Sequence, residues 1–179
     1  NNGIDCGYNP TTFKVEKSGP AIATATISDA FTDVIDVTVT ALVGYGVYEY
    51  KLDDGTFQED PVFTNVSSGE HLIYINDKKG NCYTTILTIT VLKYPKFFTP
   101  NNDGYNDYWN ITDLATQPNS TVSIFDRYGK LLKRFNTATA GWDGRYNGAD
   151  LPSDDYWFTV NYILDGKEKI FKSHFTLKR

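Results

Sequence analysis

Apolar and polar side chains alternate residue by residue in short runs along this chain, and that alternation most constrains its fold. Every second residue from Tyr156 to Leu164 is aromatic or aliphatic, with Thr159 and Asn161 among the residues between them. A period of two is that of a β-strand with one buried face, and no stretch shows a persuasive helical period. The 15% aromatic content, from 13 Tyr, 11 Phe and 3 Trp, also favours pleated sheets.

Turn-forming residues separate the runs at intervals typical of small β-sandwiches. The clearest turns are Asp53-Asp54-Gly55, Ser67-Ser68-Gly69-Glu70 and Arg127-Tyr128-Gly129. The predicted strands are residues 35–41, 47–52, 71–76, 83–91, 96–99, 107–112, 121–126, 130–135, 155–164 and 167–178.

Tyr94-Pro95 divides these strands into two groups, because proline lacks an amide hydrogen and interrupts a sheet ladder. Residues 20–93 and 94–179 are each expected to form a sandwich, the second with about seven strands. Residues 1–19 are expected to be the tail of a preceding repeat or an N-terminal strand. The predicted fold class is all-β, with two tandem Ig-like β-sandwich domains.

The two cysteines bear on the repeat organisation. The sequence around Cys82 resembles that around Cys6, since a strand-like run and then a proline follow each of them. This pattern indicates equivalent positions in successive repeats, with the two thiols far apart. The alternative, which we do not favour, is a Cys6–Cys82 disulfide that staples one domain in an oxidising compartment.

The charge differs between the two halves of the chain. Residues 1–93 hold 6 Lys and Arg against 12 Asp and Glu, whereas residues 94–179 hold 11 against 10. Neither half is basic enough to predict nucleic-acid binding. No run approaches the ~20 apolar residues that span a bilayer. Because Met is absent, we expect a fragment of a longer chain whose leader lies outside it.

The stretch from Phe97 to Asp107 carries the strongest metal-binding pattern. Oxygen ligands recur at every second residue, from the side chains of Asn101, Asp103 and Asp107 and the carbonyl of Tyr105. Such spacing can wrap a hard cation, so calcium is a possible ligand, although no cofactor is required. The alternative is a compact turn whose side chains bind the local backbone.

No arrangement of residues predicts an enzyme or a small-molecule substrate. The carboxylate pairs are adjacent in turn-like segments, and His71 and His174 lie in separate runs. No nucleophile motif or phosphate loop is present. Trp109, Trp142 and Trp157 could form a sugar platform, but core packing with a bonded indole N–H is the expected role, with Asp143 fixing the turn after Trp142.

An ordered set of motifs in the second half resembles a known family. Gly141-Trp142-Asp143-Gly144 is one of these motifs, and the others lie at residues 94–110, 122–130, 147–152 and 156–158. Together they resemble the gliding-motility-associated C-terminal domain, the type B sorting domain of the type IX secretion system of Bacteroidota. The resemblance covers about residues 94–179.

Residues 20–93 resemble, more loosely, the Ig-like repeats of very large gliding adhesins of the SprB type. The similarity lies in residues 48–55, 63–66 and 77–82, with Gly69. These resemblances imply export through the periplasm and the outer membrane, and display on the cell surface. They also imply type IX partners: a PorV-type shuttle and an outer-membrane protein of the PorP/SprF type.

The final predicted strand is a candidate contact surface for those partners. Phe171, Phe175 and Leu177 offer apolar side chains, and Lys178 and Arg179 offer positive charge. A strand that merely closes a sheet would have the same sequence. The function expected is a non-enzymatic secretion signal that follows an adhesin repeat. The alternative is a calcium-dependent or carbohydrate-binding adhesive β-sandwich module.

Overall fold

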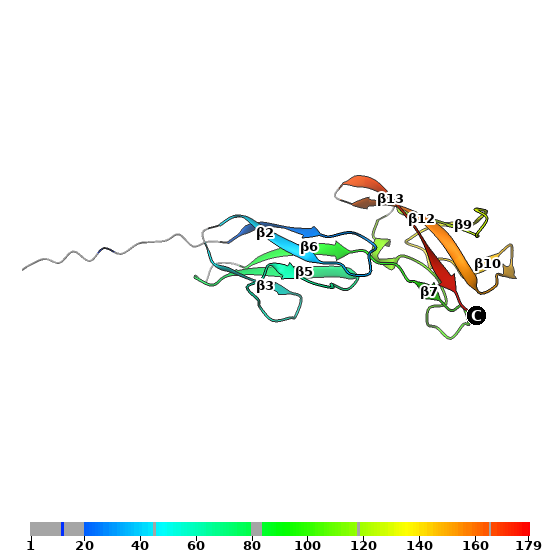
Figure 1. Ribbon diagram of the computed structural model, residues 1–179, viewed down its shortest axis with the longest axis horizontal. Helices are drawn as coiled ribbons and strands as arrows, with labels where there is room; N and C mark the ends of the chain where they lie inside the picture. The colour runs from blue at the N-terminus through cyan, green and yellow to red at the C-terminus, as the bar shows by residue number, and fades with distance from the viewer. Residues whose placement is uncertain (1–11, 13–19, 45, 80–83, 118, 165) are drawn as a thin grey trace, which may run out of the picture.

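Two β-structured units follow one another along the long axis of the molecule (Figure 1). This computed structural model describes residue 12 and residues 20–44, 46–79, 84–117, 119–164 and 166–179. The fold class predicted from the sequence, all-β with two tandem Ig-like β-sandwich units, is confirmed. Within the described residues, no helix is long and apolar enough to cross a membrane.

The N-terminal unit packs two three-stranded antiparallel sheets around one core. The first sheet has the order β1-β2-β4 and contains β1 (Ile22–Ile27), β2 (Val37–Val43) and β4 (Val62–Phe63). The second has the order β3-β5-β6 and contains β3 (Tyr48–Leu52), β5 (Gly69–Asp77) and β6 (Thr85–Val91). The predicted alternation holds, because Ile35, Val37 and Val39 are all buried in this core.

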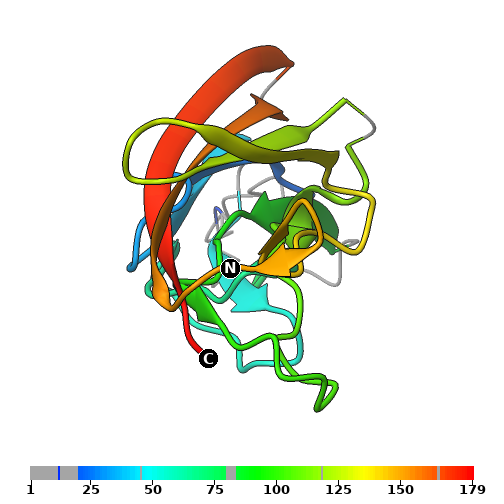
Figure 2. The same cartoon turned by 90° about the vertical axis from the view of Figure 1, so that its right-hand side faces the viewer.

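The C-terminal unit is built on a five-stranded sheet of order β7-β13-β12-β8-β9. Its strands are β7 (Phe97–Phe98), β8 (Thr121–Phe125), β9 (Leu131–Asn136), β12 (Asp154–Leu164) and β13 (Lys167–Leu177). The hairpin of β10 (Arg145–Tyr146) and β11 (Ala149–Asp150) and the 3-10 turn η1 (Thr112–Leu114) complete the unit. The end-on view shows β13 curving along the unit toward the C-terminus (Figure 2).

Each unit has its own hydrophobic core. The N-terminal core includes Val91, whereas Leu92 already belongs to the C-terminal core, which extends to Leu177. The segment between β1 and β2 crosses this division, because Phe31 is buried in the C-terminal core and Ala30 packs against it. The core thus changes between the adjacent residues Val91 and Leu92, and the division into residues 20–93 and 94–179 stays a prediction.

The strand predicted at residues 107–112 is wrong. Only a single antiparallel bridge forms there, in which Trp109 and Trp142 exchange backbone hydrogen bonds of 2.9 and 3.0 Å. Asn110 then ends the ladder, because its side-chain oxygen accepts the Ile111 N–H at 2.8 Å and its amide donates to two distant carbonyls. A short polar side chain that binds the backbone in this way competes with a sheet.

The Asn147-Gly148 pair between β10 and β11 forms a tight hairpin. Asn147 and Gly148 have φ values of 51° and 82°. Two consecutive positive φ values are typical of a type I′ turn, which joins antiparallel strands with the correct twist. This hairpin carries Asp150 toward the end of β13.

Candidate recognition surfaces

The inner face of β13 is committed to the core of the C-terminal unit. Phe175 and Leu177 are 1% and 0% exposed, and Phe175 contacts the rings of Trp109, Trp142 and Phe158. The prediction that Phe175 and Leu177 offer a surface to the translocon is therefore corrected. Side chains on alternate positions of a strand face opposite sides, and these two face inward.

Phe171 is also engaged within the chain. Its ring stacks on that of Phe31, with the centroids 4.6 Å apart and an interplanar angle of 26°. Lys178 remains exposed, and its ammonium group lies 4.3 Å from the centroid of the Phe97 ring, a cation–π distance. Of the predicted recognition residues, Lys178 is the one whose side chain lies fully on the surface beside an exposed aromatic ring.

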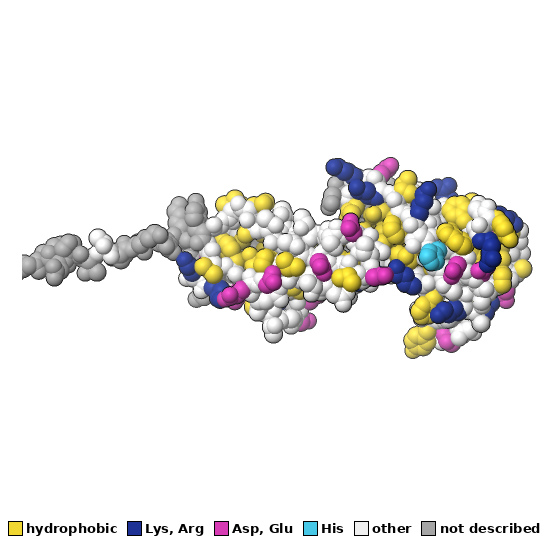
Figure 3. Space-filling view, viewed as in Figure 1, with side chains coloured by type: hydrophobic (Ala, Val, Ile, Leu, Met, Phe, Trp, Pro, Cys, Tyr) yellow, Lys and Arg dark blue, Asp and Glu magenta, His cyan; other side chains and the backbone are white. Residues whose placement is uncertain are grey.

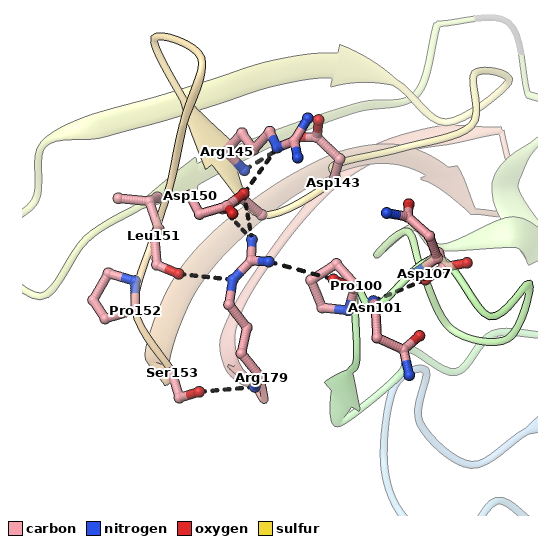
Figure 4. A network of polar contacts seen from close by, with 12 residues as sticks. Pro100, Asn101, Asp107, Asp143, Arg145, Asp150, Leu151, Pro152, Ser153 and Arg179 are labelled. Carbon is pink, nitrogen blue, oxygen red and sulfur yellow. Dashed lines mark hydrogen bonds and ion pairs between the residues drawn. The ribbon is translucent and has the colours of Figure 1, made fainter.

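Arg179 joins three segments that lie far apart in the sequence (Figure 4). Its guanidinium donates to the carbonyls of Leu151, Pro100 and Gly144 at 3.0, 3.3 and 3.2 Å. It also lies 3.2 Å from a carboxylate oxygen of Asp150. Because a guanidinium carries donors in a fixed planar fork, one side chain can serve all of these acceptors. Its geometry is that of a clamp at the end of the sheet.

Asp150 connects this clamp to the β10–β11 hairpin. Its carboxylate accepts a hydrogen bond from Nε of Arg145 at 2.8 Å. That hydrogen bond, against a smaller effect of desolvation and with further help from the charge of Arg179, lowers the pKa of Asp150. The Arg145 backbone N–H in turn donates to Asp143 at 3.1 Å, so Asp143 fixes the turn after Trp142 as expected.

The predicted calcium loop is a network of side chain to backbone hydrogen bonds. One oxygen of Asp107 accepts the N–H groups of Asn101 and Asn102 at 3.0 and 2.6 Å, and the other accepts that of Gly104 at 2.8 Å. Asp103 accepts the Tyr105 N–H at 2.8 Å. The part of the chain described by the structure contains no group of three His, Cys, Asp or Glu residues that could hold a metal ion. Calcium binding by Asn101, Asp103, Tyr105 and Asp107 stays a prediction.

Two of the three tryptophans occupy the positions expected of core residues. Trp109 and Trp142 are fully buried, and their indole N–H groups donate to the carbonyls of Pro95 and Arg145 at 2.8 and 2.9 Å. These two rings therefore cannot form a sugar platform on the surface. Trp157 is different, because it faces outward from β12 and is 42% exposed.

The outer face of the five-stranded sheet carries an open groove of about 410 Å³ around Trp157. Phe125 and His174 lie beside Trp157 on the neighbouring strands, and Thr159 and Lys172 form the next row. The space-filling view shows hydrophobic, cationic and acidic side chains around a histidine on the C-terminal unit (Figure 3). The groove combines aromatic surface with hydrogen-bond donors and acceptors. Of its residues the sequence singled out Trp157 alone, for which core packing was the expected role, and its exposure corrects that expectation.

A serine, a histidine and an aspartate come together in the N-terminal unit, although they do not form a recognisable motif in the sequence. Nδ1 of His71 lies 2.7 Å from Asp53, and Nε2 lies 3.3 Å from the hydroxyl of Ser67. However, Nε2 is closer to the Ser67 carbonyl, at 3.1 Å. Because the Asp53 carboxylate accepts, Nδ1 is the donor in that contact, and the role of Nε2 toward the hydroxyl and the carbonyl of Ser67 depends on the tautomer of the ring. This cluster is a structural tie between β5 and its flanking turns.

Both cysteines of the possible Cys6–Cys82 disulfide lie outside the described residues. That pairing stays a prediction, as does the assignment of residues 1–19 to a preceding repeat.

One comparison with known proteins finds a family model that matches the C-terminal unit. Residues 92–177 match the family model of the CHU_C type IX secretion signal domain. The match begins at Leu92 and ends at Leu177, which are the first and last residues of the C-terminal core along the chain, Phe31 excepted. The CHU_C match supports a secretion-signal role, handling by the type IX machinery in general, and export out of the cell.

Other comparisons add little to the CHU_C match. The search of curated proteins gave no match. A solved structure described as "Biofilm associated protein - BSP domain" aligns with 16% identity and a TM-score of 0.27, over 86% of this chain and 29% of that one. The present chain thus spans less than a third of that structure's length.

Proposed function

We propose that the C-terminal unit is a non-enzymatic type B sorting signal, which directs a large surface adhesin through the type IX system. The observation that carries this proposal is the coincidence between the CHU_C match and a hydrophobic core that, apart from Phe31, is built from residues between Leu92 and Leu177. A signal with its own core can present a fixed surface to a receptor. The N-terminal unit is proposed as the last Ig-like repeat of an SprB-type gliding adhesin from a member of the Bacteroidota, displayed on the cell surface.

The proposed receptor surface is the outer face of the five-stranded sheet. Trp157 is exposed there with Lys172 nearby, and at the end of the same sheet Lys178 lies over Phe97. Exposed aromatic rings and basic side chains are common among residues that contribute most to protein interfaces. The proposed partners are a PorV-type shuttle and an outer-membrane protein of the PorP/SprF type.

A reporter-export experiment tests the sorting function. A periplasmic reporter fused to residues 20–179 is expected in the medium or on the surface of cells with a working type IX system. The same reporter fused to residues 20–91, which lack the CHU_C match, is the control and should stay in the periplasm. Retention of both fusions in the periplasm would refute the sorting function.

Two matched pairs of variants test the receptor surface within that export experiment. Trp157→Thr and Lys172→Glu change the groove, whereas Ile86→Thr in β6 and Lys167→Glu in β13 make similar changes at exposed positions away from that face of the sheet. We expect the first pair to lower export by about tenfold, the effect of losing ~1.4 kcal/mol of binding, and the second pair to leave it unchanged. Equal export by all four would assign recognition to another surface.

Glycan binding is the second candidate function, and the groove around Trp157 is the observation that favours it. An exposed indole ring bordered by Thr159, Lys172 and His174 offers stacking surface together with hydrogen-bonding groups. Titration of the protein with an oligosaccharide panel, followed by tryptophan fluorescence, should show saturable changes that Trp157→Thr abolishes. A flat titration with every sugar would leave the sorting function as the sole candidate.

A further inference from the structure

Phe31 has a backbone conformation that its own unit does not explain. It lies between β1 and β2 with a φ of +66°, in the left-handed region. A bulky residue without hydrogen-bonding groups is strained there, and such strain persists only where surrounding contacts hold it. Its side chain is nevertheless 4% exposed. The contacts that offset the strain of the backbone are therefore those of the buried Phe31 ring.

The ring of Phe31 is buried among aromatic side chains of the C-terminal unit. It stacks on Phe171 at 4.6 Å, meets the edge of Tyr162 at 5.2 Å with an interplanar angle of 80°, and lies 6.3 Å from Tyr94. All three centroid distances fall in the range of favourable aromatic pairs. Tyr94, Tyr162 and Phe171 together are called the aromatic socket below.

Two polar contacts fix the same segment beside the aromatic socket. The backbone N–H of Phe31 donates to the carbonyl of Leu92 at 2.8 Å. Asp33 forms an ion pair of 2.9 Å with Lys96, just beyond the junction between the units. The left-handed conformation thus turns both the ring and the amide of Phe31 toward the C-terminal unit.

Other parts of the junction are more open. A cavity of about 500 Å³ lies between the end of β1, the end of β6 and the tip of β12, where Ile163 and Leu164 line it. Ala30 and Leu92 also line this cavity, so the aromatic contacts of Phe31 lie directly beside it.

We infer that the aromatic socket is a docking site for the preceding β-sandwich unit, and that Phe31 makes the stability of the C-terminal unit depend on that unit. The ligand class is an aromatic side chain presented on the turn between the first two strands of such a unit. A folded preceding unit holds this turn in place and completes the C-terminal core. The inference concerns folding and does not depend on the proposed sorting function.

The distribution of tryptophan makes this coupling measurable in the whole chain. All three tryptophans, Trp109, Trp142 and Trp157, lie in the C-terminal unit. Urea unfolding followed by tryptophan fluorescence therefore reports that unit alone. Any effect of a substitution at position 31 on this signal must pass between the units.

The decisive variant is Phe31→Gly, because it has opposite effects on the two units. Glycine adopts a positive φ without strain, so the turn of the N-terminal unit is relieved. Loss of the ring leaves the aromatic socket unfilled, so the unfolding equilibrium constant of the C-terminal unit should rise by about tenfold or more. Val34→Ala is the matched control, since Val34 lies in the same segment but is 61% exposed.

Two further variants distinguish coupling between the units from a general folding defect. Phe31→Leu keeps an apolar side chain and should lie between the wild type and Phe31→Gly. Phe171→Ala should cost less in the Phe31→Gly background than in the wild type, because the two rings contact each other. Coincident tryptophan transitions for wild type, Val34→Ala and Phe31→Gly, or strictly additive effects of Phe31→Gly and Phe171→Ala, would overturn the inference.

Discussion

The indole ring of Trp109 stacks on the phenyl ring of Phe175, with the centroids 3.9 Å apart and the planes inclined by only 14°. Trp109 comes from the irregular segment that covers the sheet, and Phe175 comes from β13 within it. The pair therefore joins the two layers of the C-terminal unit. It also explains why an aromatic residue near the end of the chain is required for packing rather than for contact with a partner.

Removing the Phe175 ring should strongly destabilise the C-terminal unit. Phe175→Ala is expected to lower the free energy of unfolding by about 3–5 kcal/mol, the usual cost of truncating a fully buried aromatic side chain. Urea unfolding followed by tryptophan fluorescence measures this loss of free energy. His174→Ala, at the adjacent exposed position, is the control, and a comparable loss in that variant would contradict the assignment.

The Arg179 clamp predicts a specific need for a guanidinium. Arg179→Lys keeps the charge but loses the planar fork that serves the carbonyls of Leu151, Pro100 and Gly144. We expect a loss of about 1–2 kcal/mol of stability. Lys178→Ala should change stability less, because that side chain makes one exposed cation–π contact. Urea unfolding followed by tryptophan fluorescence measures both variants. An unfolding midpoint of Arg179→Lys equal to that of the wild type would refute the clamp.

Asp107 is expected to stabilise its loop without calcium. Its carboxylate accepts three backbone N–H groups, so Asp107→Ala should lower stability by about 1–2 kcal/mol in buffer that contains EDTA. Asp103→Ala removes fewer such contacts and should cost less. Calorimetry with millimolar calcium decides between the two hypotheses. A calcium-dependent rise in the melting temperature that both variants lose would establish the metal site predicted from the sequence.

Asp113 should give the C-terminal unit an unusual pH response. Burial raises the pKa of this carboxyl group, although the Lys93 N–H and the charge of His71 act in the opposite direction. A raised folded-state pKa means that the folded protein binds the proton more tightly than the unfolded chain. This group therefore lowers stability as pH rises from the ordinary aspartate pKa through the raised value.

Asp113→Asn removes that effect while keeping an oxygen that can accept the Lys93 N–H. The variant should melt at a higher temperature than the wild type at pH 7, and the difference should vanish below the ordinary aspartate pKa. Thermal melts across pH 3–8 check this. A difference that persists unchanged into acid would point to a cause other than titration.

The sequence predicted the strands whose two faces differ clearly in polarity. β12 was anticipated almost to the residue, because Tyr156, Phe158 and Val160 face the core while Thr159 faces outward. β1 was not anticipated, because its Ala and Thr side chains give little contrast between faces. β4 spans two residues, which is too short for any periodicity to register.

The candidate site was harder to predict, because strand periodicity does not say which face an isolated motif will present. Phe175 and Leu177 have the chemistry of an interface, but their parity on β13 directs them inward. Trp157 has the chemistry of a core residue, but its parity directs it outward. The place of Phe31 depends on contact with residues more than a hundred positions away, so local sequence carries no sign of it.

The position of β13 between β7 and β12 has a consequence for protein synthesis. Phe98 in β7 pairs with Leu177 in β13, and no other described strand pairs with β7. Translation that terminates before residue 177 therefore leaves β7 with an incomplete partner and the core without the side chain of Leu177. The C-terminal unit can reach its complete fold only after the whole of β13 has been synthesised.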